Sequence, residues 1–387
     1  MFTEIVDRKN TNSAKWDELI QDTGEPDIIP LTVADMDFKT APEIVKATAA
    51  QADHGIYGYT NVSKDYLSLT RKWIVDHYFW QPEVEEIVFC PRIINALAQI
   101  VQNFTNQDDK VLIFTPLYDP IQSIVKLNDR NLIHTSLVLR NNHYEIDFAD
   151  LENKLRSGVK LMIVVSPHNP TGRVWQEKEI EKIVALAKKY NVLIFADEVH
   201  ADFVWEGKFT SLGKFLPVYD QMMIGVSPAK TFNIPGIEAA AVVIKNTALR
   251  ERFIHCLRKS GFHNPNFFCN AAVEAAYGKG EEWLARVKTV ILENRRLAID
   301  FINNNMRPCR VVPGEGTFLL WIDYTKLNIS EEALKEKFIH EAKVACSMGK
   351  GFGPEGAGFF RINIAQPYAL LKVALKKISE VIEEVRV

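Results

Sequence analysis

The chain has 387 residues, which is more than one small hydrophobic core accommodates and therefore predicts two domains. Its formal net charge of −3, with 25% charged residues, gives no electrostatic basis for binding nucleic acid or an anionic membrane. No apolar run reaches the ~20 residues of a membrane helix, and residues 1–8 lack the pattern of a secretion signal. With five cysteines and no C-x-x-C pair, we expect a cytoplasmic protein with reduced thiols.

The first part of the chain looks irregular, because Pro26, Pro30 and a polar stretch interrupt any periodic pattern over residues 1–40. From about residue 84 to 245, short apolar runs alternate with stretches of helical period such as 177–187. The strands expected there are 87–89, 111–114, 161–165, 192–196, 222–226 and 239–244. Apolar strands alternating with amphipathic helices indicate an α/β fold with a mostly parallel sheet covered by helices on both faces.

The last third of the chain shows a different order of elements. A long helix is expected at 281–304, followed by strands at 318–322 and 359–364 and by helices at 331–342 and 367–386. This mixture is typical of a smaller α+β domain. We therefore predict an N-terminal arm that forms part of the small domain (1–45), a large cofactor-binding domain (46–285) and a small C-terminal domain (286–387), joined through the long helix.

Three polar side chains follow neighbouring strands of the predicted sheet. Asn169 lies in the run SPHNPTG after one strand, Asp197 ends the next, and Lys230 follows a third in the run SPAKTFN. Ligands bind at the carboxyl ends of the strands in such sheets. An amine, an acid and an amide at that edge are what a pyridoxal 5'-phosphate site requires: an imine-forming lysine, a partner for the protonated ring nitrogen and a donor to the ring oxygen.

Each of these residues also has an ordinary structural interpretation. A lone Asp after a strand is commonly a helix N-cap, and a lone Lys is most often a solvated surface residue. The joint spacing of Asn169, Asp197 and Lys230 favours the cofactor site over these alternatives. Lys230 would then also be placed to remove a proton from the substrate Cα once it is displaced from the cofactor.

Further candidates surround this group. Ser227, three residues before Lys230, could bind the cofactor phosphate, and Tyr118, which also follows a strand, could stack on the pyridine ring. Arg361 lies inside an apolar strand, where its charge needs a partner, and a guanidinium is suited to the α-carboxylate of an amino acid. The alternatives are an ordinary core or surface tyrosine for Tyr118 and a structural ion pair for Arg361.

Two motif matches are rejected as sites, and no metal is predicted. Residues 351–356 fit G-x-G-x-x-G, but they include a proline and lead into a strand, so they are not a dinucleotide site. Residues 227–230 fit S-x-x-K, but the S-D-N and K-T-G partners of penicillin-binding enzymes are absent. The nine histidines show no H-E-x-x-H or other metal-binding spacing.

Taken together, the motifs resemble those of the fold-type-I pyridoxal phosphate enzymes, within the aminotransferase class I/II family. More narrowly, they are similar to its branch of cystathionine β-lyases, or C–S lyases, of the MalY/PatB type. The resemblance covers essentially the whole chain. The matching runs are VADMDF at 33–38, GYT at 58–60, PHNPTGRVW at 167–175, DEVHAD at 197–202, KTFNI at 230–234 and FRINIA at 360–365.

The resemblance implies a homodimer whose active site lies at the subunit interface, with Tyr59 reaching the cofactor phosphate of the partner. It implies that Ile93 and Ile94 begin the helix that supports the phosphate, and that His200 belongs to the cofactor site. Ala34 would contact the substrate together with Asn169 and Arg361.

The chain also departs from the branch pattern at four places. Arg92 replaces a usual glycine, Thr32 replaces a usual Trp, and Glu238 stands where many aminotransferases carry a phosphate-binding Arg. Residues 366–368 read QPY in place of CPR.

Three functions remain open from the sequence. The first is a β-lyase that cleaves cystathionine or cysteine-type S-conjugates to a thiol, pyruvate and ammonia. The second is an aminotransferase that uses a 2-oxo acid, which the same residues would serve. The third is a cofactor-binding scaffold without activity, motivated by the departures at Arg92 and Thr32. The runs around Asp35 and His200 favour the lyase, while the preferred sulfur amino acid and its pathway are not specified.

Overall fold

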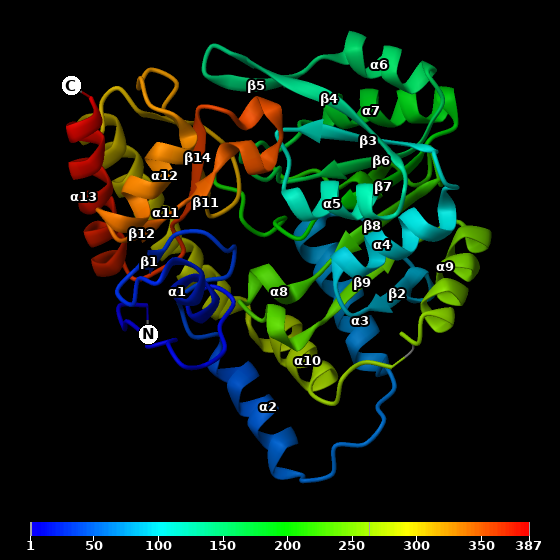
Figure 1. Cartoon of the computed structure of the whole chain (residues 1–387). Helices are drawn as coiled ribbons and strands as arrows, with labels where there is room; N and C mark the ends of the chain where they lie inside the picture. Colours follow the sequence, from blue (N-terminus) through cyan, green and yellow to red (C-terminus); the bar gives the residue numbers. More distant parts are fainter. Residues whose placement is uncertain (1, 263, 387) are drawn as a thin grey trace.

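A computed structural model describes residues 2–262 and 264–386. Figure 1 shows the large sheet with its covering helices on one side of the molecule, and the C-terminal sheet and helices on the other. The helices are α1 (Asp17–Thr23), α2 (Pro42–Asp53), α3 (Lys64–Trp73), α4 (Ile93–Phe104), α5 (Asp119–Leu127), α6 (Phe148–Arg156), α7 (Glu177–Tyr190), α8 (Pro228–Thr231), α9 (Thr247–Lys259), α10 (Cys269–Lys279), α11 (Glu281–Asn305), α12 (Glu331–His340) and α13 (Tyr368–Val385).

The large sheet has eight strands in the order β2-β9-β8-β7-β6-β3-β4-β5. They are β2 (Ile87–Cys90), β3 (Lys110–Thr115), β4 (Asn131–Arg140), β5 (His143–Ile146), β6 (Val159–Val165), β7 (Leu193–Asp197), β8 (Met222–Val226) and β9 (Ala240–Val243). The central pairs β8–β7, β7–β6, β6–β3 and β3–β4 are parallel, whereas β9 and β5 run antiparallel to their neighbours. The predicted mostly parallel sheet is confirmed.

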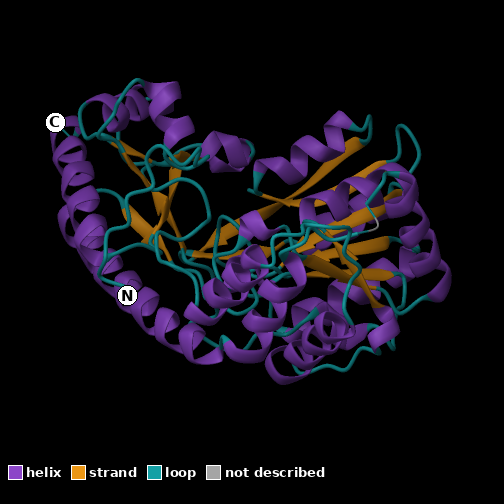
Figure 2. Ribbon diagram, turned by 90° about the horizontal axis from the view of Figure 1, so that it is seen from below, coloured by secondary structure: helices purple, strands orange, loops and turns teal. Residues whose placement is uncertain are grey.

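Successive residues of the central strands belong to two different hydrophobic clusters. In β6, Met162 and Val164 join one cluster, while Leu161 and Ile163 join the other. Side chains alternate between the two faces of a strand, so both faces of this sheet are buried. Figure 2 shows the helices that cover the sheet on its two sides. Burial on both faces explains why these strands appear in the sequence as continuous apolar runs.

The helices form where capping and periodicity agree, as α7 illustrates. Gln176 and Glu179 form a reciprocal capping box at its start, and Ile180, Ile183 and Ala187 form part of its buried face. The helix ends at Tyr190 and is capped by Asn191, whose left-handed backbone has φ 52°. The chain then enters β7 directly, which fixes where Asp197 emerges.

The C-terminal third forms a separate antiparallel sheet in the order β10-β11-β14-β13. Its strands are β10 (Arg310–Val312), β11 (Leu319–Asp323), β13 (Ser347–Met348) and β14 (Phe359–Asn363). The expected long connecting helix is α11, and α13 packs along it. The glycine-rich residues 349–356 form two short helical turns before β14 and not the start of a long helix. The division of the chain at residues 45 and 285 stays a prediction.

The first 40 residues are more ordered than expected. They contain α1 and a short strand, β1 (Ile29–Pro30), which pairs in parallel with β12 (Val344–Ala345). The arm is therefore attached to the C-terminal part of the chain. Within the described ranges, no helix has the length and apolarity to cross a membrane, and no group of three or more His, Cys, Asp or Glu side chains is arranged to hold a metal ion.

Candidate active site

The carboxyl ends of three adjacent parallel strands bring the predicted residues together. Val165, the last residue of β6, pairs with Asp197, the last residue of β7, and Asp197 pairs with Gly225 in β8. The segments that follow these strands therefore leave the sheet at one edge. Asn169 lies in the first of them and Lys230 in the short helix α8 after the third. The topology places the amide, the acid and the amine at a common site.

Lys230 points its amine back to the segment that precedes α2. Its Nζ donates a hydrogen bond of 2.7 Å to the carbonyl oxygen of Ala34. Burial lowers the pKa of the Lys230 amine to about 8, although the negative charges of Asp35 and Asp197 oppose the shift. A lysine in this state is partly unprotonated near neutral pH, as an amine that attacks a carbonyl must be.

Asp197 is buried, with 9% of its surface exposed. Its Oδ1 accepts a hydrogen bond of 3.2 Å from the backbone N–H of Val199. Burial raises the pKa of Asp197 to about 6, while the Val199 N–H and the charge of Lys230 favour the ionised form. The side chain is thus an ionised carboxylate at neutral pH in a water-poor place, where it can hold a proton on a ring nitrogen.

Arg361 enters the site from β14 of the C-terminal sheet. Its Nη1 donates to Oδ1 of Asn169 at 2.8 Å, and its Nη2 donates to the Thr32 carbonyl at 2.8 Å and to the Ser347 hydroxyl at 3.1 Å. Its guanidinium carbon lies 5.0 Å from the ring centre of Phe352. The side chain is 4% exposed, and burial lowers its pKa to about 10, so it stays charged.

The guanidinium still has hydrogen-bonding capacity. Among the described residues, the buried Nε of Arg361 has no partner. A buried donor without an acceptor costs about 1–3 kcal/mol, which makes it a place where a ligand oxygen is expected. Because Oδ1 of Asn169 accepts from Arg361, the Asn169 amide nitrogen is the part left to donate to a ligand.

Two rings complete the buried part of the site. The backbone N–H of Tyr118 donates to the Asn169 carbonyl at 3.2 Å, and burial raises the pKa of the Tyr118 phenol. His200 is 4% exposed, and burial, reinforced by the charges of Lys230 and Arg361, lowers its pKa to about 3. Its Nδ1 is buried without a partner in the described part of the chain. The imidazole is therefore neutral at physiological pH.

Ser227 caps the short helix that carries Lys230. Its hydroxyl accepts from the Ala229 N–H at 3.1 Å and donates to the Ala239 carbonyl at 2.7 Å. The hydroxyl proton is therefore committed to the protein in this conformation. The predicted contact of Ser227 with a phosphate requires the hydroxyl to rotate away from Ala239.

The N-terminus of α4 lies beside the end of β8. A Cβ atom placed on Gly225 would be 3.1 Å from Cδ1 of Ile93, so the first turn of α4 adjoins the strand that leads to Lys230. The backbone N–H groups of Ile93 and Ile94 begin this helix and have no intrahelical acceptor. The Arg92 guanidinium bonds the Glu238 carboxylate at 2.5 Å just outside this turn, so two of the departures noted in the sequence face each other.

Tyr59 does not join this group within one chain. It lies on the loop between α2 and α3, and its side chain is fully exposed. The role predicted for it depends on a second copy of the chain.

Two further residues in the quoted motifs support the site without having been given a role. Asn233 exchanges hydrogen bonds with the backbone of Met36, and Asn363 donates to the carbonyl of Val33 at 2.7 Å. Asn363 is 1% exposed and lies two residues after Arg361 in the same apolar strand, hence on the same face. A second buried polar residue at that spacing is the signal that would have identified it.

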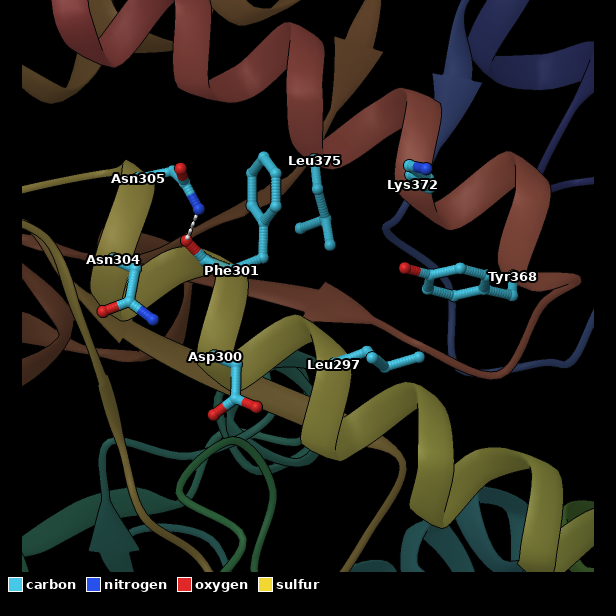
Figure 3. A pocket seen from close by; sticks show the side chains of 8 residues that line it. All are labelled: Leu297, Asp300, Phe301, Asn304, Asn305, Tyr368, Lys372 and Leu375. Atoms are coloured by element: carbon cyan, nitrogen blue, oxygen red, sulfur yellow. Dashed lines mark hydrogen bonds between the residues drawn. The ribbon is translucent and has the colours of Figure 1, made fainter.

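Two cavities lie outside this group of residues. One, of about 460 Å³, lies between the arm and the Lys230 region, and Arg8, Asp35 and Asn233 are part of its lining. The other, of about 260 Å³, lies between α11 and α13 and is shown in Figure 3. Its lining, which includes Phe301 and Tyr368, contains none of the predicted site residues.

Comparison with known families fits this geometry. The sequence pattern of the family "Aminotransferase class I and II" matches residues 26–378. The chain belongs to this family. Among similar proteins, cystathionine beta-lyase PatB of Bacillus subtilis (strain 168) is 33% identical over 381 residues, covering 98% of each protein.

Solved class I/II structures show the same fold. Cystalysin from Treponema denticola, which contains a pyridoxal 5'-phosphate cofactor, superposes with a TM-score of 0.95 at 32% identity, covering 99% of both chains. A PLP-bound putative aminotransferase from Clostridium difficile 630 also gives 0.95, at 35% identity, covering 98% of this chain and 99% of that one. The fold is thus the fold-type-I pyridoxal phosphate enzyme fold.

The residues of this chain fit the cofactor that both relatives contain. A partly neutral lysine, a buried carboxylate and an amide with free donors lie at one edge of the sheet, next to a helix N-terminus suited to a phosphate. Among the described residues, Nδ1 of His200 and Nε of Arg361 are buried without hydrogen-bond partners, so each can bond a polar ligand atom.

Proposed function

We propose that this protein is a pyridoxal 5'-phosphate-dependent carbon–sulfur β-lyase. It would cleave cystathionine or cysteine-type S-conjugates to a thiol, pyruvate and ammonia. The observation that carries the proposal is the buried Arg361 guanidinium, whose Nε has no partner among the described residues and whose charge acts on the Lys230 amine. An α-carboxylate bound there presents an amino-acid substrate to the lysine. The names of whole-length relatives such as PatB support the lyase over other reactions of this family.

The chain offers partners for each part of the cofactor. Lys230 would attach its aldehyde carbon, Asp197 would hold a proton on the ring nitrogen, and the Asn169 amide would donate to the ring oxygen. Tyr118 would pack on the ring. The α4 N-terminus, with Ile93 and its neighbour, would bind the phosphate, together with the Ser227 hydroxyl after rotation. When bound, the cofactor supplies an electron sink for the negative charge that develops at the substrate Cα.

The residues then define the course of the reaction. Arg361 holds the substrate carboxylate, and the Lys230 amine takes the proton from Cα. The bond between Cβ and sulfur breaks, and the sulfur leaves with its electron pair as a thiolate, which takes up a proton. The remaining three-carbon fragment reacts with water to give pyruvate and ammonia. With cystathionine, one water is consumed, and homocysteine is the thiol released.

We further propose that the active form is a homodimer. Ile56, Tyr57 and Tyr59 are 69%, 61% and 104% exposed, and they lie on the loop after α2 that projects from the body of the chain in Figure 1. Large apolar side chains gathered on a projecting loop are typical of a protein–protein contact. In the dimer, Tyr59 would reach the cofactor phosphate held by the partner.

The test is pyruvate release from L-cystathionine with no 2-oxo acid added. We expect equal amounts of pyruvate and homocysteine, and loss of both in Lys230→Ala, which removes the amine that takes the Cα proton. Lys178→Ala, a change of the same kind at an exposed lysine of α7, should leave the rate unchanged. If no β-thio amino acid gives pyruvate and a thiol, the lyase proposal is wrong.

The second candidate is an aminotransferase, favoured by the likeness to the putative aminotransferase of Clostridium difficile 630. The same Lys230 would return the proton to the cofactor carbon instead of allowing a leaving group to depart. A reaction that needs a 2-oxo acid and leaves the cofactor in its amine form would support it. A third possibility, a scaffold without activity, predicts that Lys230→Ala changes no phenotype of the cell.

A further inference from the structure

The backbone of residues 31–38, here called the 31–38 segment, is bonded by several side chains of the candidate site. Its carbonyl groups accept hydrogen bonds from the residues predicted to do chemistry and from the two asparagines that flank them. The donors and acceptors are Arg361 to Thr32 (2.8 Å), Asn363 to Val33 (2.7 Å) and Asp35 (2.6 Å), Lys230 to Ala34 (2.7 Å), and Asn233 to Met36 (3.0 Å) and Phe38 (2.8 Å). The position of the Lys230 amine therefore depends on where this segment lies.

Two acidic side chains of the segment are fixed by the N-terminal arm. Asp35 bonds Arg8 at 2.7 Å and lies 3.3 Å from the Lys15 ammonium. Asp37 bonds Arg8 at 2.8 Å, Lys15 at 2.7 Å and the indole N–H of Trp16 at 3.0 Å. The Lys15 side chain is only 1% exposed, and that of Asp37 is 4% exposed. Charges this deeply buried are held rigidly, because separating one pair leaves the other charge without a partner.

Asp35 is also the acid whose charge acts most strongly on Lys230. The charged groups that face the Lys230 amine are Asp35 and Asp197, which favour its protonated form, and Arg361 and Lys15, which oppose it. His200 is close too, but it is neutral at physiological pH. The N-terminal arm thus affects Lys230 in two ways. It fixes the backbone of the 31–38 segment that accepts the Lys230 hydrogen bond, and its cations partly neutralise the negative charge of Asp35.

We propose that Asp35 is a positioning residue for Lys230: held by Arg8 and Lys15, it keeps the Ala34 carbonyl on the amine and places its negative charge next to that hydrogen bond. The inference rests on the proposed role of Lys230 as the cofactor-attaching amine. Under this proposal, Arg8 and Lys15 of the N-terminal arm influence the reactivity of Lys230. If their ion pairs with Asp35 and Asp37 only stabilise the fold, the arm has no such influence.

The experiment measures attachment of the cofactor, not turnover. Full-length protein stripped of cofactor is mixed with pyridoxal 5'-phosphate over a range of pH. The rate of attachment is followed by visible absorbance, and borohydride reduction with peptide mass spectrometry locates the modified lysine. Asp35→Asn keeps the shape of the side chain but removes its charge. The pH midpoint of attachment should fall by about one unit, because loss of a neighbouring negative charge disfavours the protonated amine.

Two matched variants separate positioning from stability. Arg8→Gln removes a cation from the same cluster and should move the midpoint upward, because Asp35 keeps its charge with less compensation. Glu4→Gln, an acid-to-amide change in the exposed Glu4–Lys39 pair of the arm, should leave the midpoint unchanged. A purely structural role predicts shifts of melting temperature without opposite shifts of the midpoint.

The outcomes distinguish this inference from the function on which it rests. Midpoints that move in opposite directions in Asp35→Asn and Arg8→Gln support it, even if no lyase activity is found. If Asp35→Asn does not fold, an upward shift in Arg8→Gln supports the inference, and an unchanged midpoint overturns it. Unchanged midpoints in two folded variants overturn it while leaving the cofactor site intact. If the natural chain attaches no cofactor at Lys230, both proposals fail.

Discussion

Arg361→Lys tests whether the free N–H bonds of this guanidinium bind the substrate. A guanidinium has five N–H bonds. Three are engaged in the protein, one with Asn169 and two with Thr32 and Ser347, which leaves two without a described partner. A carboxylate that accepts from the free Nε–H and takes the place of Ser347 on the adjacent Nη2 would be held by two parallel N–H bonds. Lysine keeps the positive charge but cannot present such a pair. The substitution therefore removes the two parallel hydrogen bonds while keeping the charge attraction to the carboxylate.

The size of the effect follows from this count. If lysine restores one of the two charge-assisted hydrogen bonds, the loss is about 1.5–3 kcal/mol. That corresponds to a fall of about 10- to 160-fold in kcat/KM for cystathionine, chiefly through a higher KM, because the carboxylate is bound before the chemical step. The assay is initial-rate pyruvate release over a range of cystathionine concentrations. Cofactor attachment to Lys230 should remain normal in this variant.

Arg310→Lys is the matched control, because Arg310 lies in the same sheet and pairs with Asp323 at 3.0 Å, where it is half-exposed. It should leave kcat/KM within experimental error of the natural chain. A fall of less than about threefold in Arg361→Lys, which is under about 0.7 kcal/mol, would refute the reasoning that Arg361 grips the carboxylate through two N–H bonds.

Three further results are expected. Glu238→Gln should tighten cofactor binding by about two- to fivefold, because it removes a negative charge beside Arg92 at the α4 N-terminus. The measurement is a titration of cofactor-free protein with pyridoxal 5'-phosphate, and equal or weaker binding would contradict the prediction. Burial raises the pKa of Glu198 from 4.5 to about 8. Between pH 4.5 and 8 the folded protein keeps a proton on this side chain that the unfolded chain releases. The free energy of unfolding therefore falls as pH rises through this range. The melting temperature of Glu198→Gln should therefore increase relative to that of the natural chain as pH rises from about 4.5 to 8. If the difference in melting temperature between the two proteins is the same at every pH, the raised pKa of Glu198 is wrong. Mixing Tyr59→Ala with Lys230→Ala chains should give more lyase activity than either alone, since one site of each mixed dimer is intact; no gain on mixing would exclude the shared site.

The strands that could be predicted from the sequence are those that are buried on both faces of the sheet. β6 and β7 appear in the sequence as unbroken apolar runs because helices cover both faces of the sheet. β4 was not predicted, since only two of its ten residues are fully buried and its polar residues, among them His134 and Arg140, break any simple period. β13, with two residues, is too short to give any periodic signal.

The site divides along a similar line. Asn169, Asp197, Lys230 and Arg361 could be predicted as candidates because each is a polar side chain within an apolar strand or in the short segment that follows one. The contacts of the 31–38 segment could not, because they run through backbone carbonyls, which every residue has. Which carbonyl meets which side chain is decided by tertiary structure alone.

The hydrogen bond between Arg361 and Thr32 has a consequence for how the protein is made. These residues are 329 positions apart, and Asn363 and Val33 are 330 apart. On the ribosome, the strands that present Asp197 and Lys230 emerge well before β14, and contacts this distant in sequence form late because a long chain must close first. A growing chain therefore acquires the residues proposed to attach the cofactor before the arginine proposed to select the substrate, and an unfinished chain with β14 still in the exit tunnel lacks that arginine.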